Sequence, residues 1–144
     1  MSHNENDWIL RVGDGQNFNN SSNHEIWGVK SNCCKNILKR IRPGDRLWFV
    51  KNGSGGKLIG VSIYCSHNTR VFGPLLNISM TDKELGWTSK HRVSPWDIEI
   101  HYTDLYRLED LCLLTYIKGQ TPVREYNENC KIDLLAEYNM IKLD

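Results

Sequence analysis

Apolar and polar side chains alternate along several stretches of the chain, and this pattern predicts β-strands. In the first stretch it places Trp8 and Leu10 on one side of a strand and Ile9 and Arg11 on the other. Residues 52–56 are rich in asparagine and glycine and predict a hairpin, because both residue types tolerate left-handed backbone torsions. Strands are predicted at residues 7–12, 46–51, 57–64, 96–103 and 111–117, with a strand edge at 24–29.

Three segments have helical signals. In residues 31–41 apolar side chains recur at helical spacing and basic side chains surround them. Pro43-Gly44-Asp45 ends this helix and turns the chain, because proline cannot continue a helix. Thr81 and Glu84 form a capping-box pattern that predicts a short helix, and residues 132–143 predict a helix at the end of the chain. The apolar stripe of the first helix comprises Cys33, Cys34, Ile37, Leu38 and Ile41.

Turn-forming residues predict loops between these elements. Residues 13–22 are dense in glycine, asparagine and serine and predict a loop with many side-chain amides. Such amides suit either a plain connection or the recognition of a base edge. Residues 65–95 predict a long loop around the short helix, and loops of this length are often binding elements. Residues 104–110 fit either a bend or a continuation of the preceding strand, and residues 118–122 fit a loop.

Length and composition limit the class of protein. A chain of 144 residues that is 40% apolar predicts one globular domain over residues 1–144. No apolar run approaches the roughly 20 residues of a membrane span, and residues 1–7 lack the apolar core of a signal peptide. We therefore expect an intracellular protein without a membrane partner.

Charge and cysteine spacing narrow the candidate partners. The formal net charge of +1 gives no global basic field, but basic residues concentrate between residues 30 and 46. This local cluster fits either phosphate contacts or a solvated helix face. The five cysteines show neither CxxC nor zinc-ligand spacing, so we expect buried free thiols, no metal and no cofactor.

Sequence motifs of the common enzyme classes are missing. The sequence has no GxSxG, no HExxH, no P-loop and no GxGxxG that opens a helix. The five histidines are scattered, and we interpret them as surface or structural residues rather than catalytic bases. We predict that the protein is not an enzyme. A small hydrolase or transferase that uses a cysteine or histidine is the least favoured alternative.

Five tryptophans carry the most information about a binding site. Trp8 and Trp48 lie within strand patterns and are interpreted as core residues, and Trp96 at a strand entrance is interpreted as packing. Trp27 and Trp87 each stand beside a glycine at the edge of a loop. An aromatic face at such a place either stacks on a base or seals the core, and the residues alone leave both roles open.

Several motifs together resemble two related families. The motifs WILRV at 8–12, IWGV at 26–29 and IRPGD at 41–45 resemble the opening of EVE domains, and SPWDIEI at 94–100 continues the likeness. The motifs NGSG at 52–55, MTDKELG at 80–86 and GQTPV at 119–123 are similar to segments of YTH domains. Both families belong to the PUA-like superfamily. The resemblance therefore implies an α+β fold with a curved β-sheet or small β-barrel and peripheral helices.

The same resemblance implies a reader of modified nucleic acids. Domains of these families flip a modified base out of the strand and hold it in an aromatic pocket. By this resemblance Trp27 forms one wall of the pocket, and Trp87 or Leu85 supplies the others. Residues implied to contact the base edge are Asn17, with Asp14 and Asn19 as alternates, and those implied to contact phosphates are Lys30, Lys35, Lys39 and Arg40.

The expected partner is RNA or DNA that carries a modified, methylated base. The carboxy-terminal segment typical of EVE domains is not evident in this sequence, so the substrate class is not inherited from that family. The alternative is a protein-interaction or adaptor domain on the same fold that binds no nucleic acid. The near-zero net charge favours this alternative.

Overall fold

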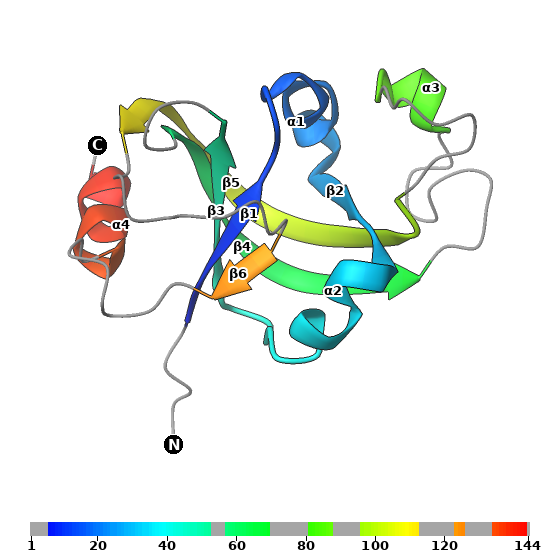
Figure 1. Cartoon of the computed structure of the whole chain (residues 1–144). Coiled ribbons are helices and arrows are strands. Elements are labelled where there is room, and N and C mark those ends of the chain that lie inside the picture. The colour runs from blue at the N-terminus through cyan, green and yellow to red at the C-terminus, as the bar shows by residue number, and fades with distance from the viewer. Residues whose placement is uncertain are drawn as a thin grey trace.

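A bent six-stranded sheet forms the frame of the protein (Figure 1). The computed structural model describes residues 6–52, 57–69, 81–87, 96–112, 123–125 and 134–143. The strand order in the sheet is β2-β5-β4-β3-β1-β6. The elements are β1 (Asp7–Arg11), α1 (Gln16–Ser21), the 3-10 helix η1 (Ser22–His24), β2 (Ile26–Val29), α2 (Ser31–Leu38), β3 (Arg46–Lys51), β4 (Lys57–Thr69), α3 (Asp82–Leu85), β5 (Ile98–Cys112), β6 (Val123–Glu125) and α4 (Leu134–Leu143).

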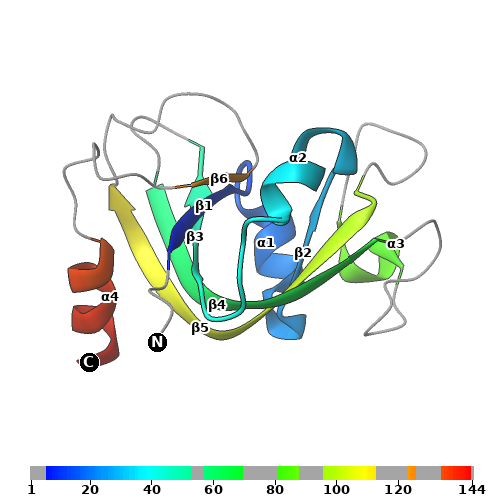
Figure 2. The same ribbon diagram turned by 90° about the horizontal axis from the view of Figure 1, so that it is seen from below.

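The sheet curves around α1 and α2, whereas α4 lies on its outer side (Figure 2). This arrangement of a curved sheet with short peripheral helices confirms the predicted α+β fold class. Among the described helices, none is long and apolar enough to cross a membrane.

Alternation along β1 and β3 supplies both faces of the sheet with apolar side chains. The two strands pair in parallel, with Trp8 opposite Leu47 and Ile9 opposite Trp48. Trp8 and Leu47 join the inner core, the cluster on the concave face that also includes residues of α1 and α2. Ile9 and Trp48 join the outer core, the cluster beneath α4. The predicted facing of β1 is therefore confirmed.

Strands β4 and β5 are longer than the sequence pattern predicts. They pair antiparallel from Lys57 opposite Cys112 to Thr69 opposite Ile98, with register shifts along the way. Asp104 has a φ of 53°, which marks one irregularity within β5. Residues 104–110 are therefore a continuation of the strand and not a bend. Cys112 likewise belongs to β5 rather than to a separate strand, and residues 113–117 lie outside the described part.

The predicted loop at residues 13–22 is wrong, because this segment contains α1 and part of η1. Gly15 has a φ of 89° and reverses the chain into the helix. The Oδ1 atom of Asp14 accepts a hydrogen bond from the Gln16 backbone N–H at 2.9 Å, which satisfies a donor at the helix start. Phe18 is buried in the inner core and anchors the helix. Packing thus overrides the low helix propensity of the asparagines.

Helix α2 ends at Leu38, three residues before the predicted end. Its buried side chains Cys34 and Leu38, together with Ile41, pack in the inner core as the apolar stripe predicts. The predicted strand from residue 96 begins at Ile98. The short strand β6 was not predicted, and it pairs antiparallel with β1, for example Ile9 opposite Arg124.

The turn after α2 is fixed by a buried carboxylate. Asp45 is fully buried, and its side chain accepts hydrogen bonds from the Trp8 indole at 2.9 Å, the Asn6 N–H at 3.1 Å and the Arg42 N–H at 3.0 Å. Gly44 precedes it with a φ of 96°, a conformation that glycine adopts without steric cost. The predicted turn therefore also ties β1 to the chain that enters β3.

Candidate functional site

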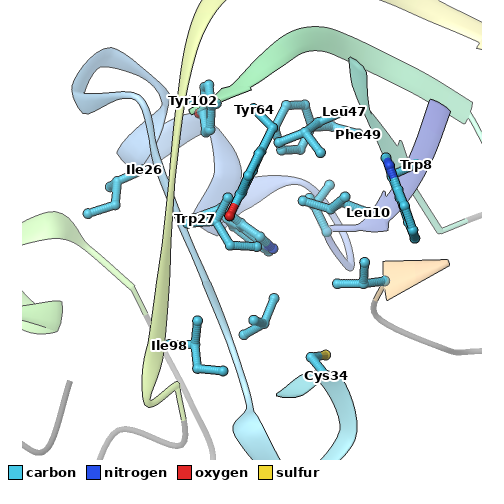
Figure 3. Packing of buried hydrophobic residues seen from close by; sticks show 14 of the residues in the cluster. Trp8, Leu10, Ile26, Trp27, Cys34, Leu47, Phe49, Tyr64, Ile98 and Tyr102 are labelled. Carbon is cyan, nitrogen blue, oxygen red and sulfur yellow. The ribbon is translucent and has the colours of Figure 1, made fainter. Parts of the chain in front are cut away.

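Trp27 projects from the edge strand β2 into the inner core (Figure 3). Its side chain is 8% exposed. Its ring lies edge to face with Phe18, at a centroid distance of 6.3 Å, and with Trp87, at 5.9 Å and an interplanar angle of 74°. Strand β2 pairs with β5, which places the Trp27 backbone opposite Ile100. The indole is therefore held by a strand of the sheet.

Leu85 at the end of α3 and Trp87, two residues after it, pack in the same cluster as Trp27. Both are buried, at 6% and 4% exposure, and both belong to the inner core with Trp27. The Trp87 indole N–H donates to the Asn17 carbonyl oxygen at 3.0 Å, and the Asn20 amide donates to the Gly86 carbonyl oxygen at 2.9 Å. Two hydrogen bonds thus connect the Leu85–Trp87 segment to α1.

Trp96 is a further aromatic residue of this site. Its ring centroid is 5.6 Å from that of Trp87, with an interplanar angle of 70°. The side chain is only partly buried, unlike Trp27 and Trp87. Sequence reasoning interpreted Trp96 as packing, because a strand-entrance position does not indicate its distance from Trp87. Trp27 and Trp87 were selected because each stands beside a glycine, and Trp96 has no neighbouring glycine in the sequence.

Gly28 makes room for two of these indoles. A Cβ atom at this position would lie 2.9 Å from the Cζ3 atom of Trp87 and 2.9 Å from the Cβ atom of Trp96. Both distances are too short for carbon atoms that do not share a bond. The glycine in the IWGV motif therefore allows Trp87 and Trp96 to pack directly on strand β2.

We expect Gly28→Ala to displace both indoles and to lower the free energy of unfolding by about 1 to 3 kcal/mol, the usual cost of overpacking. Urea denaturation measures this change. Gly60→Ala is the matched control, because its nearest atoms lie at 3.2 and 3.3 Å and belong to the side-chain ends of Leu105 and Phe18. An equal or larger cost for Gly60→Ala would contradict the explanation.

The three residues implied to contact a base edge lie on or beside α1. Asn17 is partly buried and its carbonyl oxygen binds the Trp87 indole, so it adjoins the aromatic site. Asp14 is exposed, and its carboxylate accepts a hydrogen bond from the Gln16 N–H. Asn19 is exposed, and its carbonyl oxygen accepts a hydrogen bond from the Ser22 hydroxyl. Of the three, Asn17 is the one with a described contact to an indole of the site.

The basic residues of the site occupy α2 and its two ends. Lys30 is partly exposed at the helix start, and Lys35 and Lys39 are exposed. Arg40 differs from them, because its guanidinium hydrogen-bonds Glu125 of β6 and lies 5.6 Å from the centroid of the Trp8 ring. Lys35 and Lys39 are thus open to solvent, whereas the Arg40 guanidinium has described contacts with Glu125 and Trp8.

Polar side chains on β4 and β5 form pairs. The Tyr64 hydroxyl lies 2.6 Å from the Nδ1 atom of His67, and burial raises the pKa of Tyr64 to about 12. Burial also lowers the pKa of His67. His101 lies 3.1 Å from the fully buried carboxylate of Glu99. Within the described ranges, no three histidine, cysteine or acidic side chains are grouped as metal ligands would be.

Comparison with solved structures identifies the fold. The YTH domain of the Zygosaccharomyces rouxii MRB1 protein, solved in complex with N6-methyladenosine RNA, matches with a TM-score of 0.63 at 12% identity, over 99% of this chain and 92% of that chain. The chain has a YTH-like fold. The Pho92 YTH domain in complex with m6A matches with a TM-score of 0.53 at 14% identity, over 99% and 87% of the two chains.

A hypothetical protein from Leishmania major also matches this chain, with a TM-score of 0.55 at 11% identity, over 97% of this chain and 96% of that chain. No family model matches the sequence, and no curated protein matches it either. The resemblance to YTH domains is therefore supported at the level of the fold, and the resemblance to EVE domains stays a prediction.

Proposed function

We propose that this protein is a reader domain that binds RNA through a flipped-out methylated base, held by Trp27, Trp87 and Leu85. The observation that carries the proposal is the direct contact of these two indoles, beside Leu85, on a YTH-like fold. Two similar YTH domains were solved with N6-methyladenosine ligands. N6-methyladenosine is therefore the first modified base to test.

The physical basis of the proposal is a difference in free energy between two bases. Stacking of a base on an aromatic side chain contributes about 1 to 3 kcal/mol, whether or not the base is methylated. Burial of the added methyl group among indole and leucine carbons contributes on the order of 1 kcal/mol more. Stacking thus supports affinity, and the methyl group supports discrimination.

Base binding requires one indole to turn. Trp27 and Trp87 meet edge to face at 5.9 Å, whereas a sandwiched base needs two roughly parallel faces, each about 3.5 Å from the base plane. Trp27 lies within a strand that is paired to β5. Trp87 follows the four-residue helix α3 and is held to α1 by side-chain hydrogen bonds. We therefore infer that Trp87 is the ring that turns.

The test is a titration of the protein into nine-nucleotide RNAs that differ at one position, N6-methyladenosine or adenosine, with calorimetry as the readout. We expect the methylated RNA to bind about fivefold or more tightly, the equivalent of about 1 kcal/mol. A DNA of the same sequence separates RNA from DNA recognition. Equal affinities for methylated and unmethylated RNA would overturn the proposal. No binding to any oligonucleotide at low salt would favour the adaptor alternative.

Salt dependence tests the role of α2 in the same complex. The slope of log K against log salt concentration is negative, and removing one cationic partner of a single-stranded phosphate reduces the magnitude of this slope by about 0.7. We expect this reduction for Lys35→Gln, because Lys35 is exposed on α2. Arg40→Gln is the matched control, and it should change the slope little because the Arg40 guanidinium is held by Glu125. Equal changes in the two variants would contradict this assignment.

A further inference from the structure

Trp96 occupies a different part of the aromatic site from Trp27. The Trp27 ring contacts Phe18 and Trp87, whereas the Trp96 ring contacts Trp87 at the far end of the series. Strand β2 and the start of β5 lie between α2 and α3 (Figure 2). Trp96 precedes β5 at this place and is partly exposed. A partly exposed tryptophan thus borders the buried pair.

The side chain that follows Trp96 in the sequence is hydrogen-bonded to the first residue of α2. The Asp97 carboxylate accepts hydrogen bonds from the Ser31 N–H at 2.7 Å and from the Ser31 hydroxyl at 2.5 Å. Gly28 on β2 lets the Cβ atom of Trp96 approach the strand. Two independent contacts therefore hold Trp96 and Asp97 against β2 and the start of α2.

Two basic side chains flank Ser31, one just before it in the sequence and one a helical turn after it. Lys30 immediately precedes Ser31, and Lys35 lies four residues after it, on the same side of α2 because residues i and i+4 of a helix are neighbours. Both lysines are at least partly exposed. The hydrogen bonds from Ser31 offset part of the negative charge of Asp97, which would otherwise repel a phosphate.

We propose that Trp96 is a stacking platform for the nucleotide adjacent to the methylated one, and that Lys30 and Lys35 contact the phosphates between the two. This inference rests on the proposed function. It adds a second nucleotide subsite that is insensitive to base identity, because every base presents a flat aromatic face. The domain then recognises an oligonucleotide through two bases, of which the methylated one confers selectivity.

The test compares two ligands, free N6-methyladenosine nucleoside and the nine-nucleotide RNA that contains it. We expect Trp96→Leu to lose about 5- to 150-fold in affinity for the RNA and a clearly smaller factor for the nucleoside, because Trp96 touches the pocket only through Trp87. Trp96→Phe keeps an aromatic face and should recover most of the RNA affinity. Thermal unfolding of both variants shows whether they are equally folded.

An abasic nucleotide on either side of the methylated base identifies the stacked partner. In wild type, removal of the base on one side should lower RNA affinity as much as Trp96→Leu does. The abasic RNA combined with the Trp96→Leu variant should then lose no more affinity than either change alone. Equal losses for nucleoside and RNA in Trp96→Leu would show that Trp96 only supports the pocket. No loss at either abasic position would also overturn the platform. If wild type binds neither nucleoside nor RNA, the proposed function itself fails.

Discussion

We expect Trp27→Leu to lower the affinity for N6-methyladenosine RNA by about 10- to 150-fold and to remove the preference for the methylated base. The loss of base stacking accounts for most of the change in affinity, and the loss of a rigid wall against the methyl group accounts for the change in preference. Calorimetric titration of the methylated and unmethylated nine-nucleotide RNAs measures both quantities.

The control for Trp27→Leu is the same change at Trp48. Trp48 is fully buried in the outer core, and its indole donates a hydrogen bond to Asp7 at 2.8 Å. We expect both variants to lose stability on the order of 2 to 4 kcal/mol, because each removes a large buried ring. Only Trp27→Leu should change RNA binding. A similar loss of binding in Trp48→Leu would mean that the effect arises from destabilisation.

We expect Asp45→Ala to lower the free energy of unfolding by about 3 to 5 kcal/mol, a large share of the roughly 5 to 15 kcal/mol that stabilises a domain. The variant leaves the Trp8 indole and the backbone N–H groups of Asn6 and Arg42 without their buried acceptor. A hydrogen bond to a charged group contributes about 1.5 to 3 kcal/mol. Chemical denaturation followed by circular dichroism measures the effect.

Asp14→Ala is the matched control for Asp45→Ala. The Asp14 side chain is exposed and accepts one described hydrogen bond, from Gln16 at the start of α1. Loss of one such hydrogen bond costs about 0.5 to 1.5 kcal/mol. Equal costs for the two substitutions would contradict the role assigned to Asp45. They would mean that neither the burial of the carboxylate nor its number of hydrogen bonds determines the loss of stability.

Local patterns in the sequence predict the strands near the start of the chain, β1 and β3. Side chains along β1 and β3 alternate without interruption, so the facing of Trp8 and Ile9 follows from the two-residue period of a strand. The limits of strand β5 could not be predicted in this way. Irregularities such as the positive φ at Asp104 interrupt the two-residue alternation of its side chains. Strand β6 depends on pairing with β1 and has no local signal of its own.

The candidate site was only partly accessible to sequence reasoning. Trp27, Trp87 and Leu85 come together in the structure, although their roles in binding stay a proposal. The proximity of Trp96 to Trp87 depends on how residues far apart in the chain approach β2, which no spacing encodes. Similarly, the engagement of Arg40 by Glu125 joins residues 85 positions apart. The single-domain span of residues 1–144 also stays a prediction.

The separation of the inner and outer cores by the sheet has a consequence for how this protein can change over evolution or in the laboratory. The described aromatic residues of the candidate site belong to the inner core or pack against it, whereas the outer core lies beneath α4. Substitutions more than about 7 to 10 Å apart, without shared partners, usually have additive effects. Stabilising changes under α4 that lie beyond this distance from the indoles can therefore accumulate to compensate for costly changes around them, so that ligand preference can be altered without loss of the fold.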